Sequence, residues 1–87
     1  MTVYMVESEL QGIAMNDLAG AQQLAIATAK DMSAKGTPIR YIRSTFALGD
    51  GRCMCLFEAP SAADVQQLND TAKLPYLRVV EALDLTP

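Results

Sequence analysis

Arg52-Cys53-Met54-Cys55-Leu56-Phe57-Glu58-Ala59-Pro60-Ser61 is the stretch around which this chain is organised. It is apolar at consecutive positions, bulky in the middle and polar at its ends, which is typical of a central β-strand buried on both faces. Pro60 ends this strand, because proline supplies no N–H group to a sheet. Ser61 and Asp64 then form a capping box, which marks the start of a helix. The stretch therefore predicts a strand followed at once by a helix.

The flanking segments predict three more strands and a long helix. Residues 2–9, 39–48 and 77–85 are predicted as strands, the first because it is rich in β-branched and aromatic residues. Asn16 is a candidate N-cap for a helix that runs to Ala34 and is closed by Gly36. Its buried face is predicted to hold Leu18, Ala21, Ala25, Thr28 and Met32, with Leu24 beside them. The helix after Ser61 carries a stripe of Val65, Leu68 and Ala72 and ends before Pro75.

The order of these elements is β-α-β-β-α-β, which predicts one α+β domain over residues 1–87. With right-handed crossovers this order gives a ferredoxin-like sandwich, an antiparallel sheet ordered 4-1-3-2 with both helices on one face. Cys53, Cys55, Phe57, Ile42 and Phe46 are expected to face the helices. Met54, Leu56 and Tyr41 are expected on the uncovered face, where apolar side chains call for a second copy of the chain. The sequence therefore predicts a homodimer.

Composition excludes several functions. The net charge is −3 and the arginines are scattered, whereas nucleic-acid binding needs a basic stripe. No apolar run approaches the length of a membrane span, and no leader segment is evident, so we expect a cytoplasmic protein with no membrane partner. The chain has no histidine, which removes Ser-His-Asp and Cys-His catalysis and histidine-based metal sites.

Cys53 and Cys55 stand two residues apart in one strand and share a face. Two small buried apolar groups are the simplest interpretation. They are also the weak candidates for a soft-metal site, for which no further ligand is apparent, so we predict no metal site. The methionines lie on different predicted elements and are interpreted as core filler.

Polar side chains embedded in the strands are the other candidates for a site. The pairing of residues 39–48 with residues 52–59 is expected to bring Arg43 near Glu58. These side chains form either ion pairs at a sheet rim or a pocket, in which Arg43 holds an anionic group and Glu58 or Tyr41 handles a proton. Tyr41 and Glu58 are thus the catalytic candidates. The candidate ligand-binding residues are Glu7, Tyr41, Arg43, Glu58 and Arg78.

The segment Cys55–Val65 with its Glu-Ala-Pro-Ser run, together with Leu74-Pro75 and residues 78–81, resembles a family of small bacterial domains of unknown function. Tyr4–Glu7 and Gly36–Ser44 are similar to the first two strands of that family. The resemblance implies a ferredoxin-like fold and dimers, and some members bind nickel. In that branch histidines occupy the first strand and the second helix. Here those elements offer Glu7, Ser8, Glu9, Asn69 and Lys73, so nickel is not carried over to this chain.

Three functions remain open. The first is a homodimer that binds a small ligand in a pocket at the sheet or at the dimer interface, without a cofactor. The second is a cofactor-free small enzyme of the isomerase, cyclase or monooxygenase type, an analogy at the level of fold. The third is a structural or regulatory partner of another protein.

Overall fold

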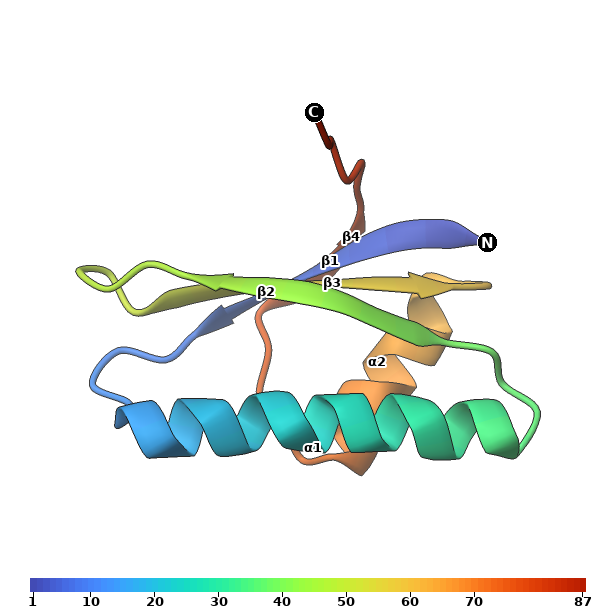
Figure 1. The fold of residues 1–87 in the computed structure, drawn as a ribbon, viewed down its shortest axis with the longest axis horizontal. Helices are drawn as coiled ribbons and strands as arrows, with labels where there is room; N and C mark the ends of the chain where they lie inside the picture. The colour runs from blue at the N-terminus through green and yellow to red at the C-terminus, as the bar shows by residue number, and fades with distance from the viewer.

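The computed structural model describes residues 1–87 as a four-stranded antiparallel sheet with two helices on one side (Figure 1). The sheet order is β2-β3-β1-β4, which is the predicted order written from the other edge, so the predicted ferredoxin-like α+β fold is confirmed. Neither helix combines the length and the apolar character needed to cross a membrane. The elements in chain order are β1 (Thr2–Glu9), α1 (Met15–Ala34), β2 (Arg40–Phe46), β3 (Arg52–Ala59), α2 (Ala62–Thr71) and β4 (Arg78–Glu81).

The two central strands, β1 and β3, hold the sheet together. They pair over their whole length, so that Tyr4 lies opposite Phe57, Val6 opposite Cys55 and Ser8 opposite Cys53. These side chains face the helices, because alternate residues of a strand share one face. The odd-numbered residues of β1 and the even-numbered residues of β3 lie on the outer face, which no helix covers.

The helix ends are set by local hydrogen bonds. Ser61 caps α2 as predicted, since its side chain accepts from the Asp64 N–H at 3.3 Å. Gly36 closes α1 with a φ of 105°, and the Thr37 N–H donates back to the Met32 carbonyl at 2.9 Å. The predicted N-cap at Asn16 is wrong. The Ala14 carbonyl already accepts from the Leu18 N–H at 3.0 Å, so α1 begins at Met15 without a side-chain cap.

A β-bulge in β2 overturns two predictions about that strand. Tyr41 lies opposite Phe57 but Arg43 lies opposite Leu56, so one extra residue is inserted between them. Tyr41 therefore lies on the helix side, edge-to-face with Phe57 at 5.5 Å between ring centroids, and not on the uncovered face. The predicted pairing of Arg43 with Glu58 is also wrong, because Arg43 lies opposite Leu56 and the bulge brings Arg40 opposite Glu58. Glu58 instead pairs with Arg40 at 3.4 Å.

The last strand is shorter than predicted. β4 ends at Glu81, and the Ala82 N–H donates to the Val3 carbonyl at 3.0 Å as the last bond to the sheet. The chain then leaves on the side away from the helices (Figure 1). There Asp84 forms an ion pair with Arg43 of β2 at 3.0 Å, although β2 and β4 are opposite edges of the sheet. The segment from Ala82 onward, which we call the C-terminal arm, is therefore directed over the outer face.

The tightly packed core lies at one end of the layer between sheet and helices. Val65 and Leu68 of α2 are fully buried, and they confirm the predicted stripe of that helix together with Ala72. From α1 the buried residues are Ala25, Thr28, Ala29 and Met32, all in its second half. Leu18 and Ala21, in the first half, are only half-buried, and Leu24 is exposed rather than beside a buried face. The first half of α1 therefore covers the sheet less completely.

Candidate functional site

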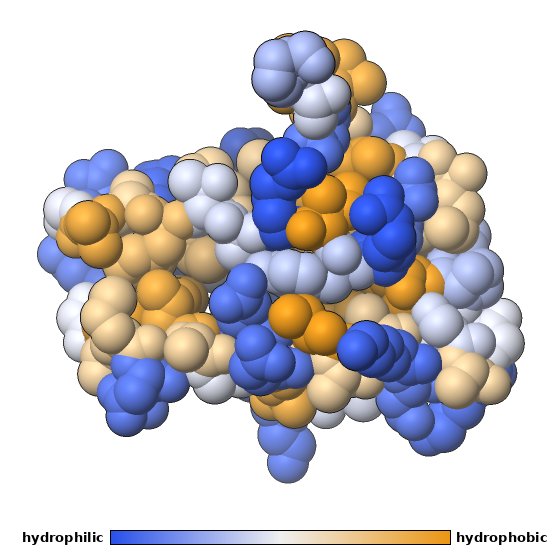
Figure 2. All heavy atoms as spheres, in the orientation of Figure 1, coloured by the Kyte–Doolittle hydropathy of each residue, from blue (hydrophilic) through white to orange (hydrophobic).

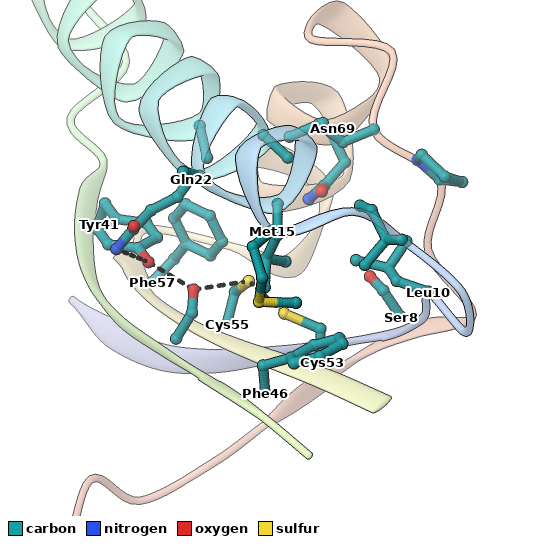
Figure 3. Close-up of a pocket in the computed structure, with 18 residues that line it drawn as sticks. Ser8, Leu10, Met15, Gln22, Tyr41, Phe46, Cys53, Cys55, Phe57 and Asn69 are labelled. Carbon is teal, nitrogen blue, oxygen red and sulfur yellow. Dashed lines mark hydrogen bonds between the residues drawn. The ribbon is translucent and has the colours of Figure 1, made fainter. Parts of the chain in front are cut away.

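A cavity of about 500 Å³ lies between the sheet and the first half of α1 (Figure 3). Its floor is the helix-facing side of β2 and β3, and its walls are α1 and the segments before α1 and after α2. Most lining side chains are apolar, and none carries a full charge at neutral pH in its ordinary state. The residues that line it include Met15, Gln22, Tyr41, Ser44, Cys53 and Cys55.

The cavity exists because small side chains face each other across the layer. Ser8, Ser44, Cys53 and Cys55 line it from the sheet. Alanines 19, 21 and 25 line it from α1. None of these side chains is long enough to fill the space between a helix and a sheet. Met15, at the start of α1, reaches over the cavity towards the two cysteines and is itself exposed (Figure 3).

Three polar groups form a hydrogen-bond chain that ends on a thiol (Figure 3). The Gln22 amide donates to the Tyr41 hydroxyl at 3.1 Å, and the Ser44 hydroxyl donates to Cys55 Sγ at 2.9 Å. Tyr41 and Ser44 are hydrogen-bonded to each other. Since Ser44 uses its own proton on the sulfur, the Tyr41 hydroxyl is the donor in this middle bond. The whole chain is therefore oriented towards Cys55.

The two cysteines are free thiols in contact, with 3.8 Å between their sulfur atoms. Cys53 is buried, at 4% exposed, whereas Cys55 is half-buried and lies nearer to Ser44. The hydrogen bond from the Cys53 thiol, aided by that from Ser44 and opposed by burial, lowers the pKa of Cys55 to about 7. The same thiol–thiol bond, together with burial, raises the pKa of Cys53. The pair is therefore divided into one thiol that ionises near neutral pH and one that stays protonated.

The structure places the predicted site residues on opposite sides of the sheet. Tyr41 lies in the cavity, as do both weak metal candidates, Cys53 and Cys55. The remaining four candidates lie on the outer face and are held in ion pairs. These four residues are Glu7, Arg43, Glu58 and Arg78.

Glu7 is the centre of the outer-face ion pairs. Its carboxylate accepts from Arg52 Nη1 at 2.6 Å and from Arg78 Nε at 2.8 Å. The hydrogen bond from Arg78 is the largest cause that lowers the pKa of Glu7; the charges of both arginines add to it, and burial opposes it. Both carboxylate oxygens are thus occupied, and the group serves to tie β1 to its two neighbours.

Ser44 and Gln22 are site residues that sequence reasoning missed. Ser44 belongs to β2 and lies opposite Cys55 on the helix side, in the regularly paired part of the strand between the bulge and the β2–β3 turn. Gln22 belongs to α1 and is not among the residues predicted for the buried face of that helix. Alternation from Phe46, which was expected to face the helices, could have placed Ser44 on that side. The bulge is needed only for Tyr41, which strict alternation puts on the opposite face from Ser44.

Comparison with known proteins identifies relatives of this chain. Residues 4–82 match the model of a family described as nickel responsive protein SCO4226-like. The chain is also similar to the crystal structure of SCO4226 from Streptomyces coelicolor A3(2), with a TM-score of 0.79 and 24% identity, covering 97% of this chain and 99% of that one. Among curated proteins none matches the chain by sequence. The structural likeness supports the fold, and the family match confirms the resemblance seen in the sequence.

Proposed function

This chain belongs to the SCO4226-like family of nickel-responsive proteins, and we propose that it is a homodimeric member that binds a small, uncharged, largely apolar molecule in the cavity beneath α1. The single observation that carries the proposal is a cavity of about 500 Å³ with no ionised side chain among its walls other than the Cys55 thiol. Ligand pockets of proteins have volumes of roughly 300–1,000 Å³ and combine apolar walls with a few polar groups.

Nickel does not fit the residues that line this cavity. The chain has no histidine, and no group of three or more histidine, cysteine or acidic side chains comes together in residues 1–87. Cys53 and Cys55 are two thiols, and the nearby Ser8 and Asn69 are weak ligands for a transition metal. Asn69 is moreover engaged, since its amide donates to the Val65 carbonyl at 2.9 Å. We therefore derive no function through nickel for this chain.

The cavity walls define the chemistry of the ligand. A charged ligand would lose its hydration without gaining a counter-ion, because the cavity offers no arginine, lysine or carboxylate. An apolar molecule gains about 25 cal/mol for each Å² removed from water. Tyr41 and Ser44 at one wall provide hydroxyl groups for one polar substituent. An apolar body with a single polar group is thus the ligand that these walls favour.

Binding of the neutral fluorophore N-phenyl-1-naphthylamine tests this proposal. We expect its emission to increase and shift to shorter wavelength with the wild-type protein. Ala21→Phe places a ring in the cavity and should weaken binding at least about tenfold, which corresponds to about 1.4 kcal/mol. Ala27→Phe, on the exposed side of the same helix, is the matched control and should bind like wild type. Equal binding by both variants, with both folded by circular dichroism, would contradict the proposal.

The proposed dimer is supported by the outer face and by the C-terminal arm. Met5, Met54, Leu56 and Val80 lie together on the outer face and are only half-buried in one chain. Leu83 and Leu85 of the arm are 83% and 86% exposed. The arm projects from that face with its hydrophobic side chains standing clear of the body (Figures 1 and 2). A two-fold related copy would cover both sets of side chains at once.

Sedimentation equilibrium at micromolar concentration tests the dimer. The wild-type chain should sediment at twice its monomer mass. The double variant Leu83→Asp with Leu85→Asp should sediment as a monomer, because it places charges where the partner would cover leucines. Leu48→Asp is the control, since Leu48 is 82% exposed but lies in the β2–β3 turn. A monomeric wild type would exclude the dimer and leave the cavity proposal intact.

A cofactor-free enzyme is the second candidate function. The observation in its favour is Cys55, a group with a pKa of about 7 on the cavity wall. Shifted pKa values in a cleft are common at catalytic sites and also occur in structural networks. We further propose that the protein resides in the cytoplasm, where free thiols such as Cys53 and Cys55 stay reduced.

A further inference from the structure

The two thiols of the cavity are close enough to react with each other. Their sulfur atoms are 3.8 Å apart, and both belong to one extended strand. Residues two apart in a strand have Cα atoms about 6.4–6.8 Å apart, which is the upper end of the range that a disulfide spans. A disulfide here would form at the cost of some strain. Strained disulfides are reduced easily and belong to the labile, redox-active kind rather than to the structural kind.

The surroundings of the two thiols assign them different roles. Cys55 is half-buried and accepts a hydrogen bond from the Ser44 hydroxyl, and its ionised form reacts as the nucleophile. Cys53 lies deeper and keeps its proton until a neighbouring sulfur has been oxidised. Cys53 and Tyr41 are the other titratable side chains that line the cavity, and α1 and α2 present no charged side chain to it. The pair thus has an attacking thiol and a resolving thiol.

From this arrangement we propose that Cys53 and Cys55 form a redox-active dithiol that is oxidised by an organic hydroperoxide whose apolar substituent occupies the cavity. The proposal rests on the proposed function, because the same uncharged apolar walls select the substituent. A polar oxidant such as hydrogen peroxide gains nothing from those walls. The hydroperoxide carries the single polar group that Ser44 and Tyr41 can hydrogen-bond.

The reaction proceeds in two balanced steps. The Cys55 thiolate attacks the terminal oxygen of the hydroperoxide, the O–O bond breaks, and the alkoxide leaves and takes up a proton to become an alcohol. Cys55 is then a sulfenic acid. The Cys53 thiol attacks the Cys55 sulfur, the S–S bond forms, and the hydroxyl group leaves with the Cys53 proton as water. Two thiols have lost two electrons and two protons, and the hydroperoxide has been reduced to an alcohol and water.

Intact-mass measurement of the reduced protein treated with cumene hydroperoxide tests the proposal. We expect the mass to fall by two hydrogen atoms with loss of both titratable thiols, and dithiothreitol should restore them. The preference for cumene hydroperoxide is the rate with this oxidant divided by the rate with hydrogen peroxide. This preference should be about tenfold larger for the protein than for the free thiol N-acetylcysteine, which corresponds to about 1.4 kcal/mol. Cys53→Ser should stop at a sulfenic acid on Cys55 that dimedone traps. Cys55→Ser should lose the fast reaction.

The outcomes separate this proposal from the proposed function. Ala21→Phe should slow cumene hydroperoxide and leave hydrogen peroxide unaffected. If N-phenyl-1-naphthylamine binds but the thiols react no faster than N-acetylcysteine, the redox proposal is wrong and the binding proposal stands. If the thiols are oxidised equally by both peroxides and the fluorophore does not bind, the apolar ligand is wrong in both proposals. If Cys55 were oxidised to a sulfinic acid and no disulfide formed, the assignment of Cys53 as the resolving thiol would be wrong. If Cys53→Ser does not fold, Cys53→Ala takes its place in the dimedone experiment.

Discussion

The two ends of the layer between sheet and helices differ in how side chains fill it. At one end Met32 of α1, Val65 and Leu68 of α2 and Ile39 before β2 pack against the sheet. At the other end small residues of both layers face each other and leave a cavity of about 500 Å³. The same two layers therefore provide a packed core and a site. The size of the side chains, and not the fold, therefore decides where this layer is hollow.

Truncating one leucine at each end measures this difference and is expected to have the largest effect. Leu68→Ala removes a fully buried side chain and should lower the free energy of unfolding by about 2–5 kcal/mol. Leu18→Ala removes a half-buried side chain that already borders the cavity, and should cost about 1 kcal/mol. Urea denaturation at one protein concentration checks both values. Equal losses would show that the cavity is closed in solution.

The rim of the hollow end depends on a glycine. Gly51 has a φ of 72°, and a Cβ there would clash with the backbone of Gln11. Its carbonyl accepts from the Leu10 N–H at 2.7 Å, in the segment that leads to α1. Gly51→Ala should therefore lower the free energy of unfolding by about 1–3 kcal/mol. Gly20→Ala, in the open middle of α1, should raise it by about 0.5–1 kcal/mol, and thermal denaturation of both variants checks the opposite signs.

Ser44→Ala tests how the hollow end of the layer stabilises the Cys55 thiolate. The Ser44 hydroxyl stabilises the Cys55 thiolate, so its removal should raise the pKa of Cys55 above about 7. The pH at which iodoacetamide modifies Cys55 at half its maximal rate should rise accordingly. Thr45→Ala is the control, because Thr45 is exposed on the outer face of the same strand. An unchanged midpoint in Ser44→Ala would mean that Cys53 alone stabilises the thiolate.

The outer face should show the smallest effect, an acid-dependent one. The pKa of Glu7 is lowered in the folded chain, so its contribution to stability is fully present above pH 4.5, the ordinary value, and is lost as the pH falls through the folded pKa. Glu7→Gln should lower the melting temperature at neutral pH and reduce its fall between pH 5 and pH 2. The effect is small because Arg52 and Arg78 remain solvated. Glu9→Gln, at an exposed carboxylate, should leave the acid-dependent fall unchanged.

Local signals predicted much of the fold and little of the site. The capping box at Ser61 and the glycine after α1 each act within a few residues, so the sequence reveals them directly. The two cysteines were visible as a pair on one face. The place of Tyr41 beside them was not, because Tyr41 reaches the helix side only through a bulge in β2. Alternation cannot foresee an inserted residue, and the same insertion brings Arg40 opposite Glu58, with which Arg43 was predicted to pair.

The sequence by itself determined the order of helices and strands, their arrangement as a ferredoxin-like sheet, the family and the absence of histidine chemistry. These follow from hydrophobic periodicity, from turn and cap residues, and from composition, all of which act locally or as sums over the chain. Only the tertiary structure decided that Tyr41 faces the helices, that the C-terminal arm is directed over the outer face, and that two thiols meet at the wall of a cavity. Those features depend on register and on side-chain volumes across layers, which no single segment contains.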